Sequence, residues 1–151
     1  MKNALIPNFA IILGLGLTIA CSRPAPFKPV TTVKELMKAT IEPTAEVAFD
    51  AAVWENGVSV GAPTNDEEWN EVRNNALTLA ESGNLLMMAP RARDELGWMT
   101  RSQALVDAGV LAAKAAESKN LDAVFVAGGQ IYQACTGCHQ QYITTVQQGP
   151  R

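Results

Sequence analysis

The residues best suited to chemistry form a five-residue stretch near the C-terminus, Cys135-Thr136-Gly137-Cys138-His139. Two cysteines separated by two residues and followed directly by a histidine are the attachment pattern of c-type haem. In a helix, residues three and four positions apart lie on one face, so Cys135 and Cys138 can hold one porphyrin edge while His139 reaches the iron from the same side. The pattern therefore predicts one covalently bound haem c with His139 as an iron ligand.

Three other interpretations of these cysteines remain open. A thioredoxin-type redox dithiol follows a strand in a βαβ unit, and no strand-like run precedes Cys135. A zinc site needs about four Cys or His ligands, whereas the chain has 3 cysteines and 1 histidine. A structural disulfide is the third alternative. Because His139 is the only histidine and follows the only C-x-x-C sequence, haem attachment is favoured over all three.

The N-terminal segment has the features of an export signal. Lys2 supplies a positive charge, and the apolar run from Phe9 to Ala20 is shorter than the roughly 18 residues that a membrane-spanning helix needs. We therefore expect residues 1–20 to be a cleaved signal peptide and the remainder to lie in the periplasm. Covalent haem is attached outside the cytoplasm in bacteria, which agrees with export.

Cys21 is the cysteine left over by the haem motif, and it lies at the expected cleavage point. The stretch Leu17-Thr18-Ile19-Ala20-Cys21 resembles a bacterial lipoprotein cleavage site, although Thr18 stands where leucine is usual. Lipidation of Cys21 would anchor the protein to a membrane surface, with residues 21–30 as an extended, proline-rich linker. The alternative is ordinary cleavage near Ala20, which would leave a free thiol in an oxidising compartment.

Charge and composition exclude several functions. The chain carries 12 Lys and Arg against 15 Asp and Glu, for a net charge of −3, and has no basic tract. Nucleic-acid binding therefore has no electrostatic support. No nucleophile–base pair or carboxylate constellation suggests catalysis, and the single histidine is assigned to iron, so we expect no enzymatic activity.

Residues 31–151 are expected to form one all-α domain. Apolar residues recur at spacings of three and four in four segments, and no convincing strand is present. The expected helices cover about 32–54 with an interruption at Pro43, residue 64 or 65 to before Pro90, about 98–118, and the residues after the cap Asn120. Thr64 and Glu67 are expected to form a capping box, and 55–64 a loop. Four amphipathic helices with short connections predict an antiparallel four-helix bundle with the cofactor at the C-terminal helix.

A helical bundle with C-x-x-C-H on its last helix resembles the class II cytochromes c, the cytochrome c′ and c-556 family. The resemblance covers residues from about 31 to 142 and is carried by the haem motif, by Tyr142 three residues on, and by Val33-Lys34-Glu35-Leu36-Met37. It implies thioether bonds to Cys135 and Cys138 and proximal iron ligation by His139. It also implies one-electron transfer with redox protein partners, and homodimers are common among members of this family.

The resemblance leaves two possibilities for the distal side of the iron. In the c-556 type, a methionine at the start of the first helix ligates the iron, and Met37 is the expected ligand here. In cytochrome c′, a bulky apolar residue such as Leu36 blocks that site, and the five-coordinate iron binds nitric oxide or carbon monoxide. Cytochrome c′ commonly has Arg or Lys four residues after the haem histidine, whereas this chain has Ile143, which favours electron transfer.

Other candidate residues carry less weight. Met99 and the pair Met87 and Met88 are alternative thioether ligands, although methionine more often fills core gaps. The three tryptophans are expected in the core, and three arginines are candidates for pairing with haem propionates. The tryptophans are Trp54, Trp69 and Trp98, and the arginines are Arg91, Arg93 and Arg101.

Overall fold

The computed structural model describes residues 27–147, with side chains described as far as residue 143. The predicted signal peptide, Cys21 and the first part of the predicted linker lie outside the described residues. The described chain is mostly helical, with 72% helix and few strands, which confirms the predicted all-α class. None of the helices within residues 27–147 is both long and apolar enough to cross a membrane.

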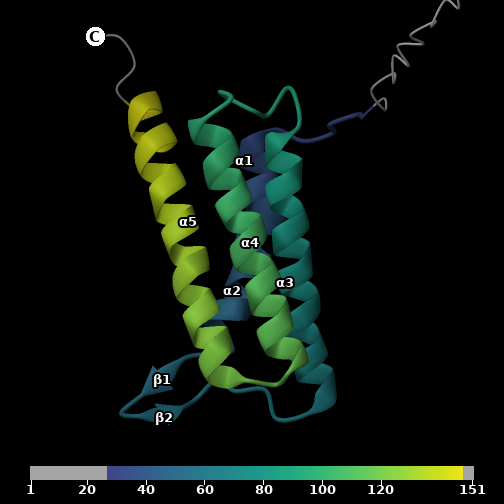
Figure 1. Ribbon diagram of the computed structural model, residues 1–151, viewed down its shortest axis with the longest axis vertical. Coiled ribbons are helices and arrows are strands. Elements are labelled where there is room, and N and C mark those ends of the chain that lie inside the picture. Colours follow the sequence, from purple (N-terminus) through teal and green to yellow (C-terminus); the bar gives the residue numbers. More distant parts are fainter. Residues whose placement is uncertain (1–26, 148–151) are drawn as a thin grey trace, which may run out of the picture.

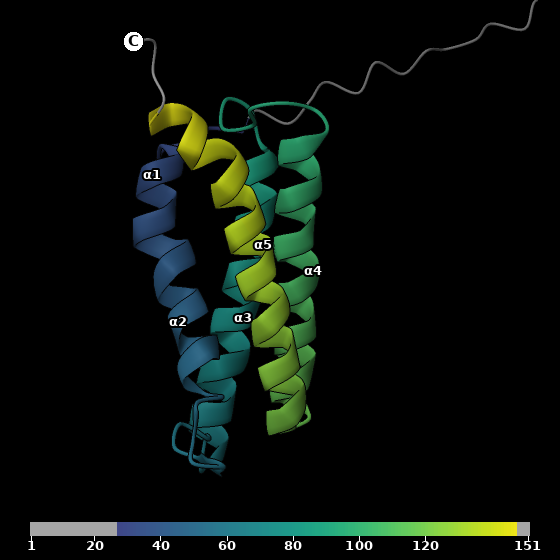
Figure 2. The ribbon, with the colours of Figure 1, turned by 90° about the vertical axis from the view of Figure 1, so that its left-hand side faces the viewer.

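The first helical segment is continuous from Val33 to Asp50 but changes its geometry along the way. The elements in order are α1 (Val33–Leu36), the π-helical turn η1 (Met37–Ile41), α2 (Glu42–Asp50), β1 (Trp54–Glu55), β2 (Val58–Ser59), α3 (Asp66–Met87), α4 (Gly97–Glu117) and α5 (Leu121–Gln147). The helices lie lengthwise beside one another, and each of α3, α4 and α5 runs opposite to the one before it (Figure 1). Figure 2 shows the α1–α2 segment beside α5, with the lower end of α2 next to α3.

The predicted helix through Trp54 is wrong at its end. It stops at Asp50, and β1 and β2 pair as a short antiparallel hairpin, so the expectation of no strand is also wrong. Asn56 and Gly57 both have positive φ angles, 51° and 80°, which suit the tight turn of a two-residue hairpin. Trp54 lies on this hairpin with 43% of its surface exposed and is not a core residue.

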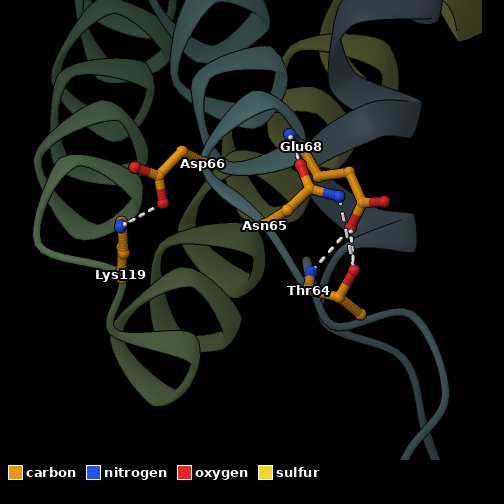
Figure 3. Close-up of polar contacts among 5 residues, drawn as sticks. All are labelled: Thr64, Asn65, Asp66, Glu68 and Lys119. Carbon is orange, nitrogen blue, oxygen red and sulfur yellow. Dashed lines mark hydrogen bonds and ion pairs between the residues drawn. The ribbon is translucent and has the colours of Figure 1, made fainter.

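The N-terminus of α3 is capped one residue later than predicted (Figure 3). Asn65 is the N-cap, and its side-chain oxygen accepts a hydrogen bond from the Glu68 backbone N–H at 3.0 Å. The Glu68 carboxylate accepts from the backbone N–H and the hydroxyl of Thr64, at 2.6 and 2.9 Å. The predicted capping box of Thr64 and Glu67 is therefore replaced by Asn65 and Glu68. The Asn65 amide oxygen accepts from the Glu68 N–H, and the Glu68 carboxylate accepts from the Thr64 N–H.

A tight connection between α4 and α5 fixes the start of the motif-bearing helix. Asn120 caps α5 as predicted, its side-chain oxygen accepting from the Ala123 N–H at 3.0 Å. Lys119 takes a left-handed conformation with φ of 53° and pairs with Asp66 at the start of α3, at 2.7 Å (Figure 3). The ends of three helices are thus tied together at one end of the molecule.

Small residues let α3 and α4 approach closely. A side chain at Gly109 would lie 2.8 Å from the Ala80 backbone nitrogen, and one at Gly83 would lie 2.8 Å from the Ser102 carbonyl oxygen. Leu79, Val124 and Ile131 are fully buried. The α3–α4 pair is therefore the closely packed part of the molecule against which the remaining helices are placed.

Candidate haem-binding site

Helix α5 presents the C-x-x-C-H motif directly after its buried stretch. The side chains that fix the orientation of α5 toward the core are Val124, Ala127, Ile131 and Ala134. Cys135 and Cys138 follow on the same side, half-buried, and His139 is more exposed. Neither of these two cysteines forms a disulfide, so both thiols are free.

A cavity of about 410 Å³ lies between α5, α4 and the first helical segment. The motif contributes Cys135, Cys138 and His139 to its wall. Most of the other wall residues are apolar, which is typical of sites that bind a flat organic cofactor. They include Ile41, Ala45, Phe49, Leu86, Leu105 and Ala134, with Glu42, Glu46 and Arg101 as the charged members.

The structure distinguishes the two residues named as candidates for the distal side. Met37, in η1, is half-buried and lines the same cavity as the motif. Leu36 is 4% exposed, belongs to the hydrophobic core and is not on the cavity wall. Met37 is also the one methionine of the described residues on that wall, since Met87, Met88 and Met99 lie elsewhere.

The thiols of the motif lie in surroundings that disfavour their ionised form. Burial raises the pKa of Cys135, and the neighbouring Cys138 raises it further. Burial also raises the pKa of Cys138, although the positive charge of Arg101 opposes the change. A nucleophilic redox dithiol requires a lowered thiol pKa, so these surroundings do not favour the thioredoxin-type alternative.

The three arginines considered for haem propionates have different surroundings. Arg101 is exposed, lies over Gly137 of the motif and donates from Nε to the Gln141 side chain at 3.2 Å. Arg91 is 6% exposed and donates to the carbonyl oxygens of Thr31 and Leu85 and to the Thr31 hydroxyl. Arg91 is therefore a structural residue, and Arg101 is the arginine at the cavity.

A cluster of three residues ties the C-terminal part of α5 to the start of α4. The Tyr142 hydroxyl donates to the Asp94 carboxylate, whose other oxygen accepts from the Trp98 backbone N–H at 3.0 Å. The Trp98 and Tyr142 rings meet edge to face, with centroids 4.9 Å apart. Trp98 is buried as predicted, and its ring N–H donates to the Leu86 carbonyl at 2.7 Å.

The hydroxyl of Ser102, on the cavity wall, bears on whether the site fits a bound cofactor. Ser102 is 2% exposed, and its hydroxyl oxygen has no hydrogen-bond partner among the described residues. A buried hydroxyl normally has a partner, so this one can serve an acceptor within the cavity. Two thiols, one imidazole, one thioether and apolar walls complete a donor set that suits c-type haem.

Metal binding by side chains alone has no support within residues 27–143. No group of three or more His, Cys, Asp or Glu side chains there is arranged to hold a metal ion. Porphyrin-bound iron takes only its axial ligands from the protein, so this result does not bear on His139 or Met37.

Apart from Met37 and Arg101, the cavity residues of η1, α2 and α4 were not predicted from the sequence. Ile41, Ala45 and Phe49 are spaced by four residues, which indicates that they share one face of a helix. Ser102 and Leu105 reach the cavity only through the packing of α4, and the local sequence gives no sign of it.

No family model, curated protein or solved structure matches this chain.

Proposed function

We propose that this protein is a monohaem cytochrome c that transfers single electrons outside the cytoplasm, with the antiparallel four-helix bundle and C-terminal haem motif of the class II cytochromes c. Its partners are redox proteins, and a lipid anchor at Cys21 would hold it at a membrane surface. One observation carries the proposal. A single cavity has Cys135, Cys138 and His139 on its α5 wall and Met37 on the wall formed by the first helical segment.

Each of these residues has a separate role in the proposal. The Cys135 and Cys138 sulfur atoms would hold a haem through thioether bonds, while His139 and Met37 would be the residues that ligate its iron. When bound, haem supplies a one-electron carrier whose iron alternates between the ferric and ferrous states, and methionine ligation raises its reduction potential. The apolar side chains of the cavity exclude water, and Arg101 offers a positive charge at its edge.

Optical and spin-state spectra of the ferric and ferrous protein test this assignment. Met37→Leu removes the thioether and keeps a side chain of similar volume. Met99→Leu is the matched control, because Met99 packs against the core away from the cavity. We expect low-spin iron in the parent and in Met99→Leu, and high-spin iron in Met37→Leu.

Two results would replace the proposal with a known alternative. High-spin iron in the parent, with ready carbon monoxide binding, would indicate a five-coordinate, gas-binding protein. Loss of all haem on acid–acetone extraction would show that no covalent bond to Cys135 and Cys138 exists and would favour a dithiol or structural role.

A further inference from the structure

Met37 is the first residue of the π-helical turn η1, which leads into the cavity-wall residues of α2. Within this turn, the Glu42 backbone N–H bonds to the Met37 carbonyl, five residues earlier. An α-helix would connect residues four apart, so the turn contains one extra residue. Such turns are rare and frequently occur at functional sites.

Pro43 gives a physical reason for the wide turn. Proline has no backbone N–H, and in a regular helix its ring collides with the carbonyl of the fourth residue before it, here Ala39. The Thr44 hydroxyl donates to the Thr40 carbonyl at 2.6 Å and to the Ile41 carbonyl at 3.1 Å. The proline thus disfavours the α-helical form, and a buried threonine supplies hydrogen bonds within the wide turn.

The extra residue changes which side chain reaches the cavity. An α-helix turns by about 100° per residue, so a regular helix extended back from α2 would place Met37 about 80° from Ala45. Ala45 is on the cavity wall. The same regular helix would place Lys38 within about 20° of Ala45, on the side of the cavity. With the one extra residue in η1, Met37 takes the direction that Lys38 would have had. In agreement, Met37 is half-buried and Lys38 is exposed.

We propose that Pro43 is a positioning residue that selects Met37, and not Lys38, for the cavity wall. The inference rests on the proposed ligation of iron by Met37. Through the wide turn, Pro43 determines which neighbouring side chain of the first helical segment can reach the iron.

The test moves the methionine by one position and then removes the proline. Three haem-loaded variants are compared by ferric and ferrous spin-state spectra: Met37→Leu, Met37→Leu with Lys38→Met, and the latter with Pro43→Ala. We expect high-spin iron in the first two, since a methionine at position 38 lies off the cavity wall while Pro43 is present. We expect low-spin, methionine-ligated iron to return in the third, where a regular helix carries position 38 to the wall.

Two further variants complete the design. Pro43→Ala alone should lose methionine ligation, with a lowered reduction potential, while retaining its helix content by circular dichroism. Pro63→Ala, a proline in the loop before α3, is the matched control and should keep the parent spectrum.

The outcomes separate this inference from the proposed function. High-spin iron in Met37→Leu, together with high-spin iron in the triple variant, would overturn the role of Pro43 and leave the ligation by Met37 intact. Low-spin iron in Met37→Leu itself would overturn the proposed ligation and this inference with it.

Discussion

Tyr142 and Asp94 join the end of the motif-bearing helix to the start of α4. Burial and the hydrogen bond to Asp94 raise the pKa of Tyr142 to about 12, from an ordinary value of 10.0. The hydrogen bonds from Tyr142 and from the Trp98 N–H lower the pKa of Asp94. Both shifts mean that the folded protein favours a neutral phenol beside an ionised carboxylate.

These shifts predict how stability depends on pH. The pKa of Tyr142 is raised by folding, so its contribution is complete below the unfolded value and is lost as the pH rises from about 10 to about 12. The pKa of Asp94 is lowered, so its contribution is lost as the pH falls through the folded value. We expect Tyr142→Phe to flatten the alkaline fall of the thermal midpoint, while Tyr132→Phe, at an exposed site on α5, keeps it.

Arg91 is the buried charged residue whose removal should be most costly. Its guanidinium serves two carbonyl groups and one hydroxyl, at 3.0 to 3.2 Å. Arg91→Ala leaves these acceptors partly buried without their donor, so we expect a loss of about 2–3 kcal/mol in the free energy of unfolding. Arg93→Ala, two residues away and exposed, should change it by less than about 0.5 kcal/mol. Equal effects of the two variants in urea denaturation would contradict the structural role of Arg91.

At the scale of the elements, two helical glycines should respond to alanine in opposite ways. A side chain at Gly109 would meet Ala80 and Ala76 backbone atoms at 2.8 and 3.0 Å, so Gly109→Ala should cost about 1–3 kcal/mol. A side chain at Gly129 would meet nothing within 4 Å, so Gly129→Ala should stabilise the protein by about 0.5–1 kcal/mol. A raised denaturation midpoint in Gly109→Ala would contradict the close α3–α4 contact, and a lowered one in Gly129→Ala would contradict the open space at Gly129.

The sequence predicted the helices where local signals determine them. Asn120 capped its helix as expected, since a cap depends on residues three positions away. The hairpin at Trp54 was missed because two-residue strands are too short to show alternation. The π turn was missed because each single spacing of four among the apolar residues at 33, 37, 41, 45 and 49 is ordinary in an α-helix. Only the sustained repeat of four, which exceeds the 3.6 residues of an α-helical turn, indicated a wider turn.

The candidate site was predictable only in part. The motif and Met37 are recognisable from residue types and from a family resemblance, and they line one cavity. Ser102 lines that cavity from α4, and its backbone carbonyl lies at the close α3–α4 approach beside Gly83. Such an arrangement depends on tertiary contacts, which no local pattern encodes.

At the scale of the whole molecule, the helices on the two sides of the cavity should differ in local stability when no haem is bound. The α3–α4 pair is closely packed, whereas η1 and α2, which continue from α1, have the cavity between them and the motif of α5. We expect a Cys135→Ala/Cys138→Ala protein, prepared without haem, to show faster amide hydrogen exchange in residues 33–50 than the haem protein. Exchange in the buried turns of α3 and α4 should change much less. A uniform increase along the chain would contradict this division.

The contact between Arg91 and Thr31 has a mechanical consequence. If Cys21 is anchored, any pull between membrane and domain passes along the linker and arrives first at Thr31. Arg91 holds Thr31 through two hydrogen bonds, to its carbonyl and its hydroxyl, each 3.0 Å long. These two bonds therefore transmit part of the force to Arg91, in the connection that follows α3, before it reaches Met37. Under the proposed anchoring, we expect this contact to reduce the displacement of Met37 relative to His139 when the linker is pulled.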